Sequence, residues 1–70
     1  MSLNSRYEIR VKDSLDGRWT AWFEGLHIAS DGDDTVIAGP VADQAALHGL
    51  LTKVRDLGLV LILVRHLGPA

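Results

Sequence analysis

The stretch "DQAALHGLLTKVRDLGLVLILV", residues 43–64, decides the fold because it joins an amphipathic helix to a wholly apolar strand. Apolar residues recur there every three or four positions and form one stripe, as in a helix that covers a core. Asp43 precedes the stripe as a capping residue, and Gly58 follows it where a left-handed helix end is favoured. The pattern predicts one long helix that packs through Ala46, Leu47, Leu50, Leu51, Val54 and Leu57.

The predicted strand after this helix is apolar at every position from Val60 to Val64. Such a run indicates burial on both faces of a sheet, whereas one helix covers only one face. In a ferredoxin-like order the strand would also lie at the sheet edge, where an exposed apolar row invites pairing. We therefore predict a homodimer with two-fold symmetry that buries the open sheet face or this edge, with Val60, Ile62 and Val64 as candidate dimer-strand residues.

Three further strands are predicted upstream of the helix. Apolar and charged residues alternate in "RYEIRVK", residues 6–12, which is typical of a half-buried strand. Residues 26–30, "LHIAS", and 35–39, "TVIAG", form a predicted pair joined by a turn at "DGDD". We expect residues 1–5 and 67–70 to be frayed tails of a single domain that spans residues 1–70.

The stretch "GRWTAWFEGL", residues 17–26, holds three of the chain's four Trp, Tyr and Phe residues. The spacing of Trp19, Trp22 and Phe23 favours one or two helical turns over a strand. Stacking platforms for nucleobases normally have basic neighbours, and here Arg18 is the only one. We interpret the cluster as core or interface, with a ligand-binding surface as the alternative.

These elements follow the order strand, short helix, strand, strand, long helix, strand. That order predicts an α+β domain with the ferredoxin-like split βαβ plan (βαββαβ), a stunted first helix and a four-stranded antiparallel sheet. The alternative is a ββαβ or βββαβ sheet with one helix and an irregular aromatic loop.

Composition narrows the classes of function. The chain has 70 residues, no cysteine and a net charge of −2, with seven Lys and Arg residues scattered along it. The charge distribution argues against a nucleic-acid partner, and the apolar run at residues 57–64 is far shorter than the roughly 20 residues that span a bilayer. Without cysteine there are no disulfides and no thiolate chemistry, so a partner subunit is the most available supplement to a small core. We expect a cytoplasmic protein with neither membrane nor nucleic-acid partners.

No residue set indicates catalysis, a metal or a cofactor. The three histidines lack ligand spacing, and the Asp31–Asp34 cluster fits a turn better than a Ca²⁺ loop. One polar helix face could bind a small anion or a partner chain, although a solvated face is the simpler interpretation; it carries Gln44, His48, Thr52 and Arg55. Gly49 interrupts the helix at a cost of about 0.5–1 kcal/mol, which suggests close approach of another backbone, from a partner subunit or from the loop before the helix, or a tolerated surface glycine. Together the candidate ligand or interface residues are Trp19, Trp22, His48, Gly49, Thr52 and Arg55.

The segments "RWTAWFEGLHI", "TVIAGPVADQAALHGLL" and "VRDLGLVLILV" resemble a family of short, uncharacterised bacterial proteins, over about residues 7–65. The "W..WF.GL" and "GPV.DQAALHGLL...RDLGL" signatures carry the resemblance, which implies a self-standing domain but no activity, cofactor or catalytic residue. We therefore expect a non-enzymatic homodimeric module that serves as an adaptor or regulatory accessory. The alternatives are a small-ligand sensor with a pocket at the dimer interface, near the aromatic cluster and His48, and a small dimeric enzyme.

Overall fold

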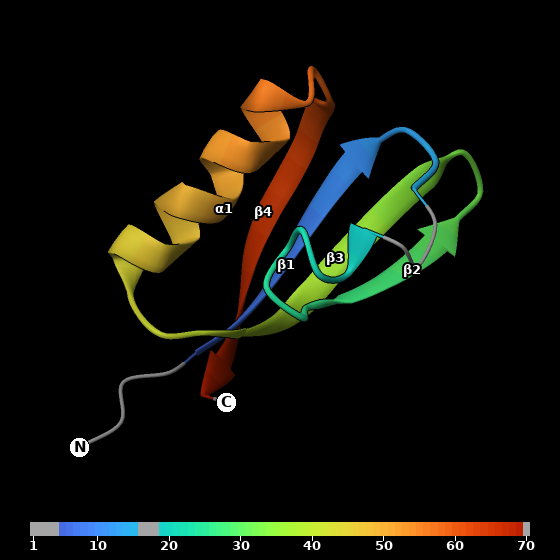
Figure 1. Ribbon diagram of the computed structural model, residues 1–70. Helices are drawn as coiled ribbons and strands as arrows, with labels where there is room; N and C mark the ends of the chain where they lie inside the picture. The colour runs from blue at the N-terminus through green and yellow to red at the C-terminus, as the bar shows by residue number, and fades with distance from the viewer. Residues whose placement is uncertain (1–4, 16–18, 70) are drawn as a thin grey trace.

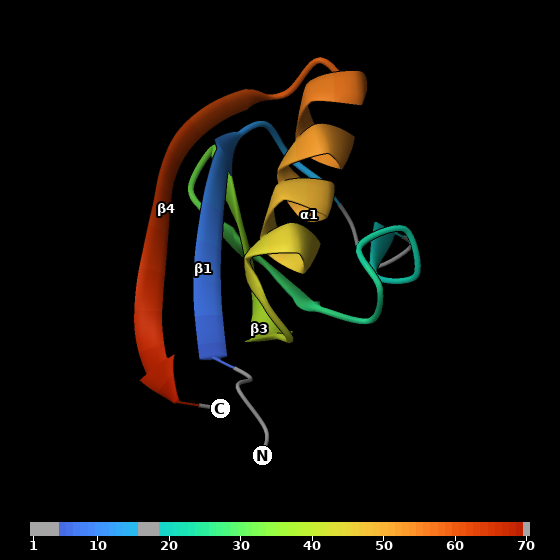
Figure 2. The ribbon, with the colours of Figure 1, turned by 90° about the vertical axis from the view of Figure 1, so that its left-hand side faces the viewer.

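The computed structural model describes residues 5–15 and 19–69, and over these ranges it forms one four-stranded sheet with one helix (Figure 1). The strands lie in the order β2-β3-β1-β4, and every neighbouring pair is antiparallel. The helix packs over one face of this sheet (Figure 2). The inner strands are therefore β1 and β3, and the two edges are β2 and β4. The elements are β1 (Ser5–Lys12), β2 (His27–Asp31), β3 (Asp34–Val41), α1 (Gln44–Asp56) and β4 (Val60–Pro69).

The first crossover, from β1 to β2, contains an irregular turn in its described part instead of a helix. The Phe23 and Gly25 amides donate to the carbonyls of Trp19 and Thr20, which makes about one turn. Glu24 and Gly25 then take positive φ angles of 60° and 80°, which end the turn. The two-helix ferredoxin-like plan is therefore not matched, and the βββαβ alternative with one helix describes the chain. The broader prediction of an α+β fold with a four-stranded antiparallel sheet is confirmed.

The helix begins and ends where its capping residues predict. The Asp43 carboxylate accepts a hydrogen bond from the Ala46 amide at 2.8 Å. At the other end Gly58 has a φ of +72°, and the Leu59 amide donates to the Val54 carbonyl at 3.2 Å. Together with the bond from the Gly58 amide to the Arg55 carbonyl at 2.9 Å, this forms a Schellman motif, which reverses the chain sharply and directs it into β4.

The β2–β3 hairpin also follows the prediction. Asp31 pairs with Asp34 in register, and Gly32 lies between them with a φ of +63°. A two-residue turn with a positive φ matches the right-handed twist of the strands that it joins.

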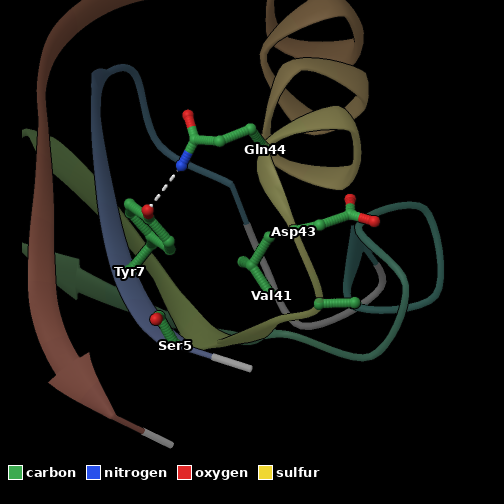
Figure 3. A pocket seen from close by; sticks show the side chains of 6 residues that line it. Ser5, Tyr7, Val41, Asp43 and Gln44 are labelled. Atoms are coloured by element: carbon green, nitrogen blue, oxygen red, sulfur yellow. Dashed lines mark hydrogen bonds between the residues drawn. The ribbon is translucent and has the colours of Figure 1, made fainter. Parts of the chain in front are cut away.

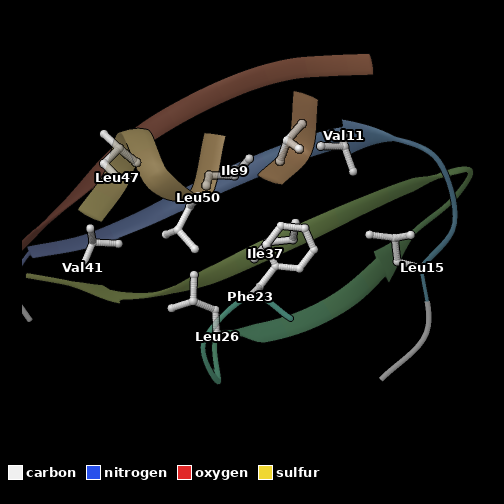
Figure 4. Packing of buried hydrophobic residues seen from close by; sticks show 10 residues of the cluster. Ile9, Val11, Leu15, Phe23, Leu26, Ile37, Val41, Leu47 and Leu50 are labelled. Carbon is white, nitrogen blue, oxygen red and sulfur yellow. The ribbon is translucent and has the colours of Figure 1, made fainter. Parts of the chain in front are cut away.

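The core lies between α1 and the sheet and draws on β1, β3, α1 and the crossover (Figure 4). Phe23, Ile9, Val11 and Ile37 have no solvent exposure. The buried apolar residues are Ile9, Val11, Leu15, Phe23, Leu26, Ile37, Val41, Leu47, Leu50 and Val54. Because none of them belongs to β4, that strand is joined to the rest of the molecule mainly through its main-chain pairing with β1.

One buried polar side chain fastens the crossover to the sheet. Thr35 has no solvent exposure, and its hydroxyl donates to the Asp13 carbonyl at 2.6 Å. The same hydroxyl accepts from the Leu15 amide at 3.0 Å. A single threonine therefore satisfies two main-chain groups of a segment that has no ladder of its own.

The strands extend further than the sequence indicated. The tails predicted at residues 1–5 and 67–70 are replaced by strand at Ser5 and through Pro69, which pair with each other across β1 and β4. Residues 1–4 and 70 lie outside the described ranges. The end of β4 is a strand because the first residues of β1 pair with it.

Candidate functional site

The candidate site is the outer edge of β4, defined here by its exposed large apolar residues and called the β4 edge. In the described ranges, Trp22 is the only exposed large apolar side chain that lies elsewhere. The β4 edge comprises Val60, Leu61, Ile62, Val64 and Leu67, which are 37–60% exposed. Figure 2 shows β4 at the outside of the sheet, beside β1, with α1 over one face only.

The register with β1 assigns the β4 side chains to the two faces. Leu61 pairs with Val11 and Val64 with Ile9, so both lie on the face that α1 covers. Leu63 pairs with Arg10 and therefore lies on the open face. Register shifts occur next to Ile62 and Leu67, each of which is an extra residue relative to β1.

The helix does not reach far enough to cover the β4 edge. Leu61 and Val64 remain 46% and 37% exposed although they lie on its side of the sheet. The sequence predicts burial of this strand on both faces, and the isolated chain provides it on neither. An apolar strand of ten residues with a free main-chain edge is thus left open to a partner.

The open face of the sheet carries charged side chains, several of which form ion pairs with one another. The Arg10 guanidinium bonds the Asp31 carboxylate at 2.6 Å and the Asp34 carboxylate at 3.1 Å. These two carboxylates raise the pKa of Arg10 above its ordinary value. Arg65 of β4 reaches across to Glu8 of β1 at 2.7 Å. A face whose charges satisfy one another is suited to water rather than to an apolar partner.

A shallow hollow of about 240 Å³ lies beside the start of α1, and two of its polar side chains bond each other (Figure 3). The Gln44 amide donates to the Tyr7 hydroxyl at 2.8 Å. The Tyr7 ring also lies 5.0 Å from that of His66 on β4. The arrangement positions β4 against β1 and leaves Gln44 and Tyr7 engaged with each other.

The predicted polar helix face is exposed, and the side chains of His48, Thr52 and Arg55 do not form a common binding site. The Thr52 hydroxyl donates to the His48 carbonyl one turn earlier, at 2.9 Å. Arg55 contacts its neighbour Asp56 at 3.4 Å. A Cβ built on Gly49 would meet nothing within 4 Å, so the predicted close approach by the preceding loop is wrong. The approach of a second subunit to Gly49 stays a prediction.

The aromatic cluster divides between core and surface. Phe23 is fully buried and Trp19 is half-buried against the core, whereas Trp22 is 44% exposed. The Lys53 amine lies 5.6 Å from the centroid of the Trp22 ring and donates to the Trp22 carbonyl at 2.8 Å. Of the two predicted roles, core or interface, the core role is therefore wrong for Trp22, because the turn presents that ring to the side of α1, and its role at an interface stays a prediction.

The residues suggested for a ligand pocket lie on different sides of the helix. Lys53, which contacts Trp22, is five positions from His48, so the two side chains are about 140° apart around the helix. A pocket that uses both Trp22 and His48 therefore does not exist within the described residues of one chain. Across residues 5–15 and 19–69 there is also no group of three or more His, Cys, Asp or Glu side chains suited to a metal ion.

Two residues of the β4 edge escape the sequence analysis. Leu67 falls within the predicted tail, and Leu61 is absent from the predicted dimer-strand residues Val60, Ile62 and Val64, which alternate along the strand. The extra residue at Ile62 breaks that alternation, and a bulge of this kind leaves no reliable mark in an entirely apolar run. The continuation "RHLGP" after Val64 is the available sign that the strand runs on.

Comparison with known proteins identifies a family. A family model described as "Domain of unknown function (DUF8691)" matches residues 6–65, which is most of the chain. No curated protein and no solved structure matches the chain. None of the helices in the described ranges is long and apolar enough to cross a membrane. The chain belongs to the DUF8691 family, as its resemblance to an uncharacterised family led us to expect.

Proposed function

We propose that this member of the DUF8691 family is a small non-enzymatic module that works as a homodimer, as an adaptor or a regulatory accessory. The observation that carries the proposal is the β4 edge, which concentrates exposed apolar side chains along one free strand. A contiguous apolar surface of this kind marks an interaction site in a small soluble domain. A second copy is the partner that every cell expressing the chain supplies.

An estimate of the energies supports a dimer held by more than apolar contact. Burying the exposed half of a Val, Leu or Ile side chain contributes about 1 kcal/mol, so the five residues give about 5 kcal/mol per copy and about 10 kcal/mol per dimer. Association costs about 4–15 kcal/mol in lost freedom of motion. Since the two terms are of similar size, main-chain hydrogen bonds along the free edge have to contribute to a stable dimer.

The polar chemistry of the described residues supports an interaction module over an enzyme. Carboxylates of the open face pair with arginines, and Tyr7 and Gln44 in the hollow beside α1 bond each other. A general acid or base needs a titratable group that is free to reach a substrate within a cleft. The cysteine-free sequence is compatible with a reducing compartment, and the chain resembles bacterial proteins, so a bacterial cytoplasm is part of the proposal.

Sedimentation equilibrium of the full chain tests the proposal. We expect the average mass to rise from near 7.6 kDa towards twice that value between about 1 and about 100 µM protein. The Ile62→Lys variant should shift this rise to higher concentration, and Ala29→Lys on β2 is the matched control. A folded monomer at every concentration contradicts the proposal.

A further inference from the structure

We infer that two copies pair antiparallel along their β4 edges, about a two-fold axis at Val64, to form one continuous eight-stranded sheet with both α1 helices on the same face. This inference rests on the proposed homodimer and specifies its geometry. It selects the edge over the open sheet face, and it fixes which residues of the two strands lie opposite each other.

The open face is the less suitable interface because its charges are already paired. Stacking two open faces would remove water from the Arg10 pairs with Asp31 and Asp34, and from the pair between Arg65 and Glu8. Desolvating charged pairs costs as much as their attraction returns, or more. Edge pairing leaves the side chains of β1 and β3 on this face in water.

The second edge, β2, is also unsuitable. It has five residues, against ten in β4, and it ends at the charged Asp31. Short edge strands that carry charge are the usual protection against pairing with another chain. Strand β4 has a single charged residue, Arg65, among its first eight positions.

A two-fold axis perpendicular to the sheet brings identical strands together antiparallel and keeps each face continuous. Between the two register shifts β4 follows β1 regularly from Leu63 to His66. An axis within that stretch has to pass at a residue, because otherwise side chains of opposite faces would lie opposite each other. An axis at Arg65 would place two guanidinium groups together, and an axis at Leu63 or His66 would pair only seven residues of each strand against nine at Val64, so Val64 is the central residue.

With Val64 at the axis, Arg65 lies opposite Leu63 of the partner subunit, on the open face. The ladder then runs from Val60 to Gly68 and leaves out Pro69, which has no N–H to donate. On the helix face Leu61 and Val64 would be covered by the same strand of the second copy. On the helix face this arrangement gives apolar side chains that are exposed in one chain an apolar neighbour from the second copy.

Single-cysteine cross-linking tests the geometry, because the natural chain contains no cysteine. The full chain would carry Val64→Cys on β4, Ala29→Cys on β2 or Ala38→Cys on the open face, with oxidised glutathione as the oxidant. Two cysteines at the axis have an effective concentration in the millimolar range, so Val64→Cys should cross-link about tenfold faster than either control. Non-reducing gels measure the rate.

The outcomes separate the geometry from the dimer itself. Fastest cross-linking of Ala29→Cys or Ala38→Cys, in chains that sediment as dimers, overturns the edge geometry and leaves the homodimer standing. A wild-type chain that sediments as a monomer overturns both.

Isotope-filtered NOE spectra of mixed labelled and unlabelled wild-type chains give a second readout that needs no variant. They should show contacts between Val64 of one copy and Val64 of the other, and contacts centred on β2 would overturn the inference.

Discussion

The two edges of the sheet differ in what lies beyond them. At one edge β2 is short and polar, and the crossover that leads into it supplies Phe23 and Leu26 to the core. At the other edge β4 is twice as long and supplies no residue to the buried core, yet it carries most of the exposed large apolar side chains in the described ranges. The β2 side of the sheet has its apolar residues buried within the chain. The β4 side presents apolar residues that the chain leaves exposed. The first can be tested by unfolding and the second by association.

The largest effect is expected where the crossover enters the core beside β2. Phe23→Ala should lower the free energy of unfolding by about 3–5 kcal/mol, because a fully buried ring leaves a cavity in a small domain. Urea unfolding followed by circular dichroism measures it. Trp22→Ala is the matched control, and its loss should be well below that of Phe23→Ala because the ring is 44% exposed. Equal losses would show that the crossover is not anchored through Phe23.

The next effect concerns the β4 edge. Ile62→Lys should raise the dissociation constant of the dimer about 100-fold, or about 2.8 kcal/mol, because each interface would receive two lysines in place of apolar side chains. Ala29→Lys on β2 should leave the constant within about a factor of two. Analytical ultracentrifugation of both variants checks this. A larger rise in the dissociation constant from Ala29→Lys than from Ile62→Lys would show that β2, and not β4, forms the interface.

A smaller loss is expected from the hydroxyl that holds the crossover. Thr35→Val keeps the shape of the side chain but leaves the Asp13 carbonyl and the Leu15 amide without their partner. We expect a loss of about 1–3 kcal/mol in the free energy of unfolding, measured in urea. The companion variant Thr35→Ser retains the hydroxyl and should recover part of it. If Thr35→Val unfolds like the wild type, water replaces both bonds.

The smallest effect is expected on the open face. Arg65→Gln removes the ion pair with Glu8 at the surface and should change the free energy of unfolding by about 0–1 kcal/mol, less at high salt. Thermal unfolding at two salt concentrations measures it. It should not weaken the dimer, because Arg65 would lie opposite Leu63 of the partner subunit with its charge in water. A loss of dimer in this variant would indicate that the open face takes part in the interface.

The sequence predicts the elements whose ends are marked by chemistry and misses those that depend on tertiary contacts. Asp43 and Gly58 bound the helix, and "DGDD" marks the hairpin, so both are found from local rules. The first crossover carries helical spacing, but the backbone at Glu24 and Gly25 ends it after a single turn. The apolar run of β4 predicts burial on both faces, which the chain itself does not provide, and burial by a second copy stays a prediction.

The residues of the candidate site also divide into those that a local pattern reveals and those that depend on tertiary contacts. Val60, Ile62 and Val64 are recognisable because an apolar run needs cover, and the structure exposes all three. Leu67 is not recognisable, because its place in β4 depends on pairing with the start of β1. His48, Thr52 and Arg55 share a helix face as predicted, but helix periodicity does not show whether they meet a partner.

Amide hydrogen exchange, measured by NMR at low and high protein concentration, tests the central claim most directly. If the β4 edge is where a second copy pairs, amides of β4 that point away from β1 should exchange about tenfold more slowly at concentrations where the dimer forms. The amides of β2 should exchange at the same rate at both concentrations. Concentration-independent exchange along β4, or new protection confined to β2, would contradict the account.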